Sequence, residues 1–343
     1  MIRIGKRKIS LDSKPLIVAE IGINHFGSLK LAKKIVDSIK KCGAEAVKVQ
    51  IHIPNEEMSE EAKKIKPGNS NKNIFKIIKD NCLSLDEELK LKRYIEKKNL
   101  IYIATPFSYA AADWLNKNKI KIFKVGSGEC NNLPLIKYIS KFKKPMIVST
   151  GMNSIKSISK TVKILNKEKI PHVLLHCVNL YPVKYNLIRL NRIILFKKKF
   201  PKSIIGYSDH SIGNTIPTAA LGLGAKLIEK HFVISKKRKG PDVICSMDEQ
   251  ELRELLFASK NVHDSLSSRK DVIKEENITR RFAFHSVVSN SDIIKGQKFS
   301  KKNLTTKRPG TGFFPASKIN TLYGKKSKTN IKKNRLIRKN DVL

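Results

Sequence analysis

The sequence predicts an α/β protein in which a closed (β/α)₈ barrel precedes a small, mostly β domain. Between residue 15 and about residue 265 of the 343-residue chain, eight short β-branched runs alternate with longer amphipathic segments. This alternation is typical of repeated βα units, and eight parallel strands close a barrel. Polar or ionisable residues stand at the end of every run, where a barrel gathers its functional groups. Residues after 280 show short alternating runs and turn signals instead, which predicts a second fold.

The candidate strands are short and rich in Ile, Val, Leu and Ala. They are Leu16–Ile21, Ala46–Val49, Leu100–Ala104, Ile122–Val125, Pro145–Val148, His172–Leu175, Ser203–Gly206 and Lys226–Glu229. Start signals precede the helices between them. Ser84-Leu85-Asp86-Glu87, for example, is a capping box that predicts a helix over Leu85–Lys97.

Three parts are expected along the chain. The barrel covers residues 1–266, a charged linker that is poor in core residues covers 267–280, and the small domain covers 281–343. Within the last part, Phe284–Val288 and Ile331–Ile337 alternate in hydrophobicity, and Arg308-Pro309-Gly310 indicates a turn.

Composition excludes several classes of protein. The formal charge is +41, but the 70 Lys and Arg residues are spread over the whole length, so we expect no nucleic-acid partner and instead a field that attracts an anionic substrate. The five cysteines form no C-x-x-C pair, which fits a reducing compartment. The first residues lack an apolar signal region and no run is long enough to span a membrane. These features predict a soluble, cytoplasmic protein.

Two candidate strands each lead to a histidine. His210 follows the strand at 203–206, and His231 follows the strand at 226–229. Adjacent strand ends would place the two imidazoles across a pocket, where they suit a divalent cation such as Mn²⁺ or Zn²⁺ and leave positions for water or substrate. The alternative is a pair of buried, hydrogen-bonded core histidines.

The other strand-end side chains fall into two chemical groups. One group combines lysines, hydroxyls and an amide, which suits a phosphate plus a carboxylate: Lys48, Thr105, Lys124, Ser127, Ser149 and Asn179. The other offers donors and acceptors for a polyhydroxylated molecule: Glu20, Gln50, Tyr181 and Asp242. Both lysines lie within apolar strands, where a charge without a function is costly to bury.

A long excursion, His52 to Asn81, separates the second and third candidate strands. Segments of this length inside a compact domain are usually functional or disordered. We expect a lid that brings Asn69 to the pocket, with a mobile linker as the alternative.

Several ordered motifs resemble the N-acetylneuraminate (sialic acid) synthase family over essentially the whole chain. They are Ala19–His25, Lys124–Leu135, Ile147–Ser154, Ser208–His210, Glu229–Phe232, Gly240–Met247 and, within what resembles a C-terminal antifreeze-like (SAF) domain, Lys307–Gly310. The chain departs from the family pattern at Tyr207, where leucine is usual, and at Phe26 and Val49, none of which is a proposed ligand.

The resemblance implies a transferase that condenses phosphoenolpyruvate with N-acetylmannosamine and releases phosphate. It implies His210 and His231 as ligands of a divalent metal, with Mn²⁺ expected and Mg²⁺ or Co²⁺ as alternatives, and Glu129 near the metal-bound water. It implies that the first group of strand-end residues given above, joined by Asn69, binds phosphoenolpyruvate. It implies that the second group binds the sugar. It also implies a domain-swapped homodimer in which Phe282 and Arg308 of one SAF domain cover the partner's site.

Two other functions remain open. A legionaminic or pseudaminic acid synthase would keep the chemistry and take a 2,4-diacetamido-hexose, because sugar choice depends on a few contacts that the sequence does not locate. A non-enzymatic protein that binds polyanions would bind less tightly as salt rises.

Overall fold

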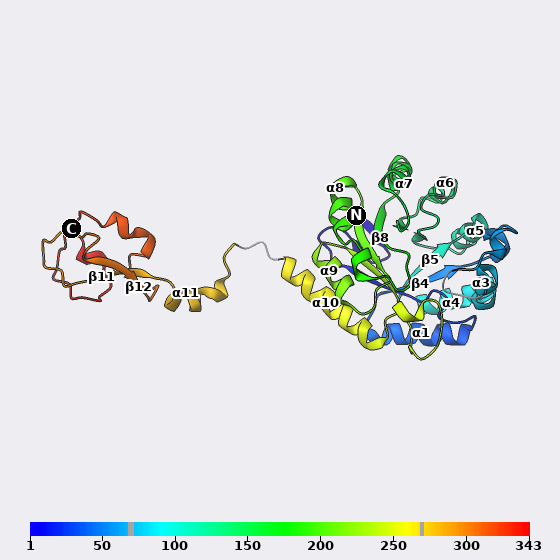
Figure 1. Cartoon of the computed structure of the whole chain (residues 1–343), viewed down its shortest axis with the longest axis horizontal. Coiled ribbons are helices and arrows are strands. Elements are labelled where there is room, and N and C mark those ends of the chain that lie inside the picture. The colour runs from blue at the N-terminus through cyan, green and yellow to red at the C-terminus, as the bar shows by residue number, and fades with distance from the viewer. Residues whose placement is uncertain (68–71, 268–270) are drawn as a thin grey trace. The chain divides into compact units, whose positions relative to one another are not determined.

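A computed structural model describes residues 1–67, 72–267 and 271–343 of the chain. The chain forms two compact units, Met1–Ser267 and Ser268–Leu343, shown in Figure 1. The helices in the described part of the chain all lack the combination of length and apolarity that crossing a bilayer requires.

The first unit is a closed barrel of parallel strands. Its order is β10-β3-β4-β5-β6-β7-β8-β9. The strands are β3 (Leu16–Glu20), β4 (Ala46–Ile51), β5 (Ile101–Pro106), β6 (Phe123–Val125), β7 (Met146–Ser149), β8 (His172–Cys177), β9 (Ile204–Asp209) and β10 (Leu227–His231). The predicted barrel and its eight strands are confirmed.

An α-helix follows each strand of the barrel. The helices are α1 (Leu29–Cys42), α4 (Leu85–Lys97), α5 (Tyr109–Lys117), α6 (Leu133–Ser140), α7 (Ile155–Lys167), α8 (Asn191–Lys199), α9 (Thr215–Gly222) and α10 (Glu249–Ser267). Helix α4 has the predicted bounds and capping box: the Glu87 backbone N–H donates to Ser84 Oγ, and Glu87 Oε2 accepts from the Ser84 backbone N–H.

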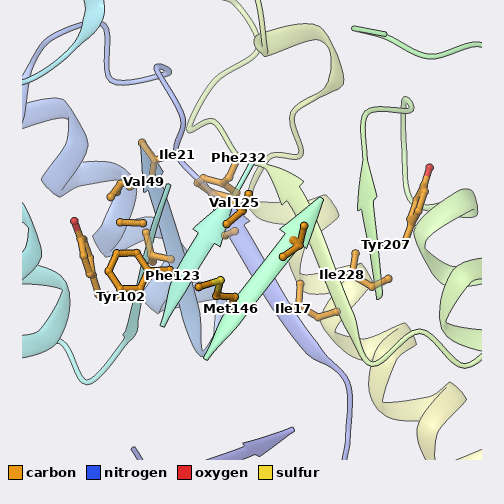
Figure 2. Packing of buried hydrophobic residues seen from close by; sticks show 14 of the residues in the cluster. Ile17, Ile21, Val49, Tyr102, Phe123, Val125, Met146, Tyr207, Ile228 and Phe232 are labelled. Carbon is orange, nitrogen blue, oxygen red and sulfur yellow. The ribbon is translucent and has the colours of Figure 1, made fainter. Parts of the chain in front are cut away.

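The barrel has apolar layers on both sides of the sheet. Outward side chains such as Tyr102, Phe123 and Ile228 pack between the strands and the helices, as Figure 2 shows. A second cluster, which includes Val18 and Ile103, fills the N-terminal half of the lumen. The antiparallel hairpin of β1 (Ile2–Ile4) and β2 (Arg7–Ile9) adds Ile2, Ile4 and Ile9 to this cluster. The N-terminal half of the lumen is therefore filled by apolar side chains, and its polar residues lie toward the carboxyl ends of the strands.

The excursion after β4 carries helical structure of its own. It contains α2 (Pro54–Glu57) and α3 (Ile74–Asn81), and Ile77 and Ile78 of α3 are buried. Asn69, which the sequence places in a lid, lies outside the described residues.

The second unit is small, and its strands form a two-stranded antiparallel sheet. Helix α11 (Asn277–Ala283) begins inside the predicted linker and precedes the antiparallel strands β11 (Ser286–Ser289) and β12 (Leu304–Lys307). Its core contains Val287, Phe299 and Ile337 among others. The predicted mostly β character of this part is confirmed.

Candidate active site

Strand alternation brings the predicted site residues together. Along β3, Leu16 and Val18 belong to the apolar lumen cluster, and Glu20 follows two residues later. Successive side chains of a strand point to opposite faces, so Glu20 also faces the lumen. The same alternation places Lys48 two residues after Ala46, and Glu229 and His231 two and four residues after Leu227. The lumen is thus apolar where the strands begin and polar where they end.

These polar ends line an inner cavity of about 210 Å³. The predicted residues that line it are Glu20, Lys48, Gln50, Thr105, Lys124, Ser127, Glu129, Ser149, Asn179, Tyr181, His210 and His231. Asp242 lines an adjoining outer cavity of about 470 Å³, which shares Gln50, Phe107, Glu129 and Tyr181 with the inner one. The structure therefore gathers the predicted residues of the barrel, apart from Asn69 outside the described residues, around two adjoining cavities.

A buried ion-pair network crosses the inner cavity, and we call it the lumen network: Glu20, Lys48, Glu229 and Lys124. Lys48 Nζ lies 2.7 Å from Glu20 Oε1 and 3.3 Å from Glu229 Oε1. Lys124 Nζ lies 3.3 Å from the same Glu229 oxygen and donates to Ser149 Oγ at 2.8 Å. Two lysines and two carboxylates share the space, so an entering anion meets lysines that are already held in place.

Burial and neighbouring charges shift the titration of these groups. Burial by itself would lower the pKa of Lys48, but Glu20 and Glu229 outweigh it and hold that pKa above its ordinary value. Burial lowers the pKa of Lys124, and Glu229 opposes the shift only in part. Burial also raises the pKa of the Glu129 carboxyl, whose Oε2 has no hydrogen-bond partner.

The two histidines face the same cavity. Their ring centroids lie 5.8 Å apart. His210 Nδ1 lies 2.8 Å from the carbonyl of Val178, so that nitrogen is the donor and Nε2 keeps a lone pair. His231 Nδ1 is buried without a hydrogen-bond partner, and its Nε2 lies 3.4 Å from Glu20 Oε2.

This donor set fits a divalent cation held by two imidazoles. Within residues 1–67, 72–267 and 271–343, no group of three or more His, Cys, Asp or Glu side chains is arranged to hold a metal. Two protein ligands would therefore need water or substrate oxygens to complete the coordination, as an open catalytic site does.

A glycine makes room for one member of the anion-binding set. The Gly151 backbone N–H donates to Ser127 Oγ at 3.0 Å. A Cβ at Gly151 would overlap Asn179 Oδ1, so only glycine allows the amide of Asn179 to approach so closely.

Sequence reasoning gives no role to several residues that line the inner cavity. Glu229 is the most important, because it joins both lysines and accepts from Ser208 Oγ at 3.1 Å. The available signal was its spacing of two residues from His231, which puts both on one face of β10. Cys177 and Phe107 also line the cavity, and nothing in their sequence context distinguishes them from core residues.

Phe282 and Arg308 belong to the second unit. The side chain of Phe282 is exposed on α11. Arg308 lines a cavity of about 690 Å³ together with Lys307, Arg335 and Arg338. Both residues are available for contacts outside their own unit.

The fold and site define a class of protein: a (β/α)₈-barrel enzyme whose polar site, with two buried lysines and two facing histidines, lies at the carboxyl ends of its strands. The chain belongs to the NeuB family, which matches residues 35–271, and residues 285–343 match the SAF domain. It is a sialic-acid-type synthase, and the resemblance inferred from its motifs is confirmed.

Named relatives differ in the acid that they make. The chain is 36% identical over 337 residues to the N,N'-diacetyllegionaminic acid synthase of Campylobacter jejuni subsp. jejuni serotype O:2, covering 95% of this chain and 99% of that protein. It is 31% identical over 326 residues to the pseudaminic acid synthase of the same organism, covering 94% of each. The N-acetylneuraminic acid (sialic acid) synthetase of Leptospira borgpetersenii serovar Hardjo-bovis superposes with a TM-score of 0.74 at 32% identity, covering 82% of this chain and 95% of that one.

Proposed function

We propose that this chain condenses phosphoenolpyruvate with the aldehyde of an open-chain N-acetylated amino sugar and releases phosphate. The observation that carries the proposal is the lumen network, which presents two fixed lysines beside hydroxyls in the inner cavity. Lysine supplies charge and the hydroxyls supply directional hydrogen bonds, which together suit a molecule with one phosphate and one carboxylate.

Lys48, Lys124 and Ser149 would hold the phosphoenolpyruvate, with Thr105, Ser127 and Asn179 completing its contacts. Thr105 Oγ1 is buried without a partner, as expected of a group that waits for a ligand. The methylene carbon of phosphoenolpyruvate then forms a bond to the aldehyde carbon, and its neighbouring carbon becomes an oxocarbenium. No protein side chain forms a covalent bond in this step, so the chain acts by positioning and by electrostatics.

Water must next add to the oxocarbenium, and phosphate leaves by C–O cleavage. Glu129 would accept the proton of that water, because its Oε2 is unpaired and its raised pKa makes the carboxylate a better base. A cation on His210 and His231 would supply Lewis acidity toward the aldehyde oxygen.

The sequence predicts N-acetylmannosamine as the acceptor, and the outer cavity favours a less polar sugar. Gln50, Tyr181 and Asp242 offer hydrogen bonds to either molecule. The facing wall is apolar, formed by Ile23, Met58, Ile74, Ile77 and Ile78. Such a wall suits the second acetamido methyl of a 2,4-diacetamido-hexose, the sugar class that would lead to the product named in the relative with 36% identity.

The assay is phosphate release from phosphoenolpyruvate with Mn²⁺, with N-acetylmannosamine and the 2,4-diacetamido sugar compared and a chelated control. Faster release with the diacetamido sugar supports the outer-cavity argument, and faster release with N-acetylmannosamine supports the sequence prediction. No release with either sugar contradicts the proposed reaction. A polyanion-binding protein would instead show binding that falls steeply with salt.

We also propose that the active form is a homodimer in which each SAF domain covers the partner's site. Large apolar side chains are exposed on loops at the carboxyl ends of the barrel strands, among them Met152, Leu180 and Ile212. Exposed groups of this kind mark interaction surfaces when they gather at one end of a fold. Arg308→Ala should impair turnover, and a barrel truncated before Arg281 that works normally would contradict the proposal.

A further inference from the structure

A buried histidine–carboxylate pair stands at the start of the excursion after β4. His52 follows β4 directly, and Glu57 ends helix α2; their side chains are 6% and 5% exposed. His52 Nδ1 lies 3.0 and 3.1 Å from the two carboxylate oxygens of Glu57. The pair therefore links the barrel strand to the first helix of the excursion.

His52 and Glu57 themselves line the outer cavity, and the imidazole also contacts two further residues of its wall. Its Nε2 lies 3.2 Å from Gln50 Oε1. Its face stacks on Phe107, with ring centroids 4.4 Å apart and an interplanar angle of 7°. Gln50 and Phe107 both line the inner and the outer cavity, so His52 supports the point where the two cavities meet.

The contacts of Gln50 determine how its amide is turned. Its Nε2 donates to Glu20 Oε1 at 2.9 Å, so its Oε1 faces His52. A rotation of the amide by half a turn would place its oxygen against the Glu20 carboxylate, where two acceptors repel. Both ring nitrogens of His52 lie within hydrogen-bond distance of an oxygen, Nδ1 of the Glu57 carboxylate and Nε2 of Gln50 Oε1.

We propose that His52 and Glu57 are positioning residues for the acceptor sugar: they hold Gln50 in one orientation and join it to helix α2. This inference rests on the proposed function, because it assigns Gln50 to the acceptor side of the site. Lys124 and Ser149 make no contact with this pair among those the structure describes, and Glu20 keeps Lys48 whether or not His52 is present. Loss of the pair should therefore weaken binding of the acceptor sugar and leave binding of phosphoenolpyruvate unchanged.

The test compares KM values for the two substrates in the full-length protein. His52→Phe keeps a ring that can stack on Phe107 and removes both hydrogen bonds. With Mn²⁺ and the sugar that the wild type turns over, the acceptor KM should rise about tenfold, the effect of losing one net hydrogen bond to a charged group. The phosphoenolpyruvate KM should not change. Glu57→Gln retains one acceptor oxygen for Nδ1, so it should raise the acceptor KM less than His52→Phe does.

Glu61→Gln is the matched control, since Glu61 belongs to the same excursion but accepts from Ser59 on the exposed surface. An acceptor KM that stays at the wild-type value in His52→Phe overturns the inference. Equal rises in both KM values also overturn it, because they indicate a general structural role. If His52→Phe does not fold, Glu57→Ala provides the same comparison. A wild type without activity would contradict the proposed function itself.

Discussion

Two clusters of buried charge lie on opposite faces of the barrel sheet, and strand β10 contributes a residue to each. The lumen network faces the inner cavity, and a second cluster of Tyr207, Asp209, Ser211 and Lys230 faces outward, where Figure 2 shows Tyr207 in the apolar layer. In the outward cluster Asp209 pairs with Lys230 and accepts from Tyr207 Oη at 3.0 Å and Ser211 Oγ at 2.8 Å, and Lys230 Nζ donates to the Ser211 carbonyl at 2.5 Å.

The difference between the clusters is how completely their atoms are paired. Around the lumen network, Thr105 Oγ1, Glu129 Oε2, Glu229 Oε2 and His231 Nδ1 are buried without partners. In the outward cluster, no described side-chain N or O atom is left in that state. Unpaired buried polar atoms are costly and persist where a ligand will satisfy them. The comparison indicates that the lumen network serves binding, whereas the outward cluster holds the ends of β9 and β10 together.

The largest expected effect on turnover is at His210 and His231. His210→Ala and His231→Ala should each abolish phosphate release, because one remaining imidazole would not hold the cation that we propose activates the aldehyde. Metal content by elemental analysis and turnover in the presence of Mn²⁺ check this directly. A chelator should abolish wild-type turnover, and added Mn²⁺ should restore it. Substantial activity in either variant, measured with the chelator present, would show that the reaction does not need the metal.

Matched lysine substitutions separate the roles of the two clusters. Lys230→Met leaves Asp209 buried without its cation, which should lower the free energy of unfolding by about 3–5 kcal/mol. Lys124→Met should cost less stability, because Glu229 retains Lys48 and Ser208 beside an open cavity. It should instead raise the KM for phosphoenolpyruvate more than Lys230→Met does. Chemical denaturation and steady-state kinetics together measure both effects. A larger loss of stability in Lys124→Met than in Lys230→Met would contradict the roles assigned to the two clusters.

Tyr207 adds a hydrogen bond to the outward cluster that an apolar side chain would not make. Tyr207→Phe removes only the hydroxyl that donates to Asp209. We expect the free energy of unfolding to fall by about 1 kcal/mol with turnover unchanged. A loss of turnover without a loss of stability would show that the outward cluster also acts on the adjacent His210.

A buried carboxyl outside both clusters tests how such a group is accommodated without a paired cation. Burial raises the pKa of Glu88 on α4 to about 8, and its Oε2 has no partner. The folded state then binds more protons than the unfolded state, so stability is fully present below about pH 4.5 and is lost as pH rises toward 8. The slope should reach at most about 1.4 kcal/mol per pH unit. Denaturation from pH 5 to 8 should show this slope in the wild type and a smaller one in Glu88→Gln.

Much of the fold and of the site can be predicted from local sequence. The alternation of apolar runs predicts eight strands, and the capping box at Ser84 predicts the start of α4, because both depend on residues a few positions apart. The rule that strand ends gather on one face of a barrel predicts that Lys48, Lys124 and His231 share a pocket.

Other features depend on contacts between residues that are far apart in the sequence, and local patterns do not encode such contacts. Glu229 bridges Lys48 and Lys124 only because barrel closure places β10 beside β3, more than 200 residues apart in sequence. His52 supports Gln50 only because Phe107, from the end of β5, supplies the ring on which it stacks.

The sequence by itself determined the fold class, the residue types of the site and the family, since these follow from periodicity and from motifs of adjacent residues. The tertiary structure alone decided which charges are paired and which atoms remain unpaired. The physical reason is that the burial and partners of a polar group depend on every element packed around it, and the barrel assembles those elements from the whole length of its chain.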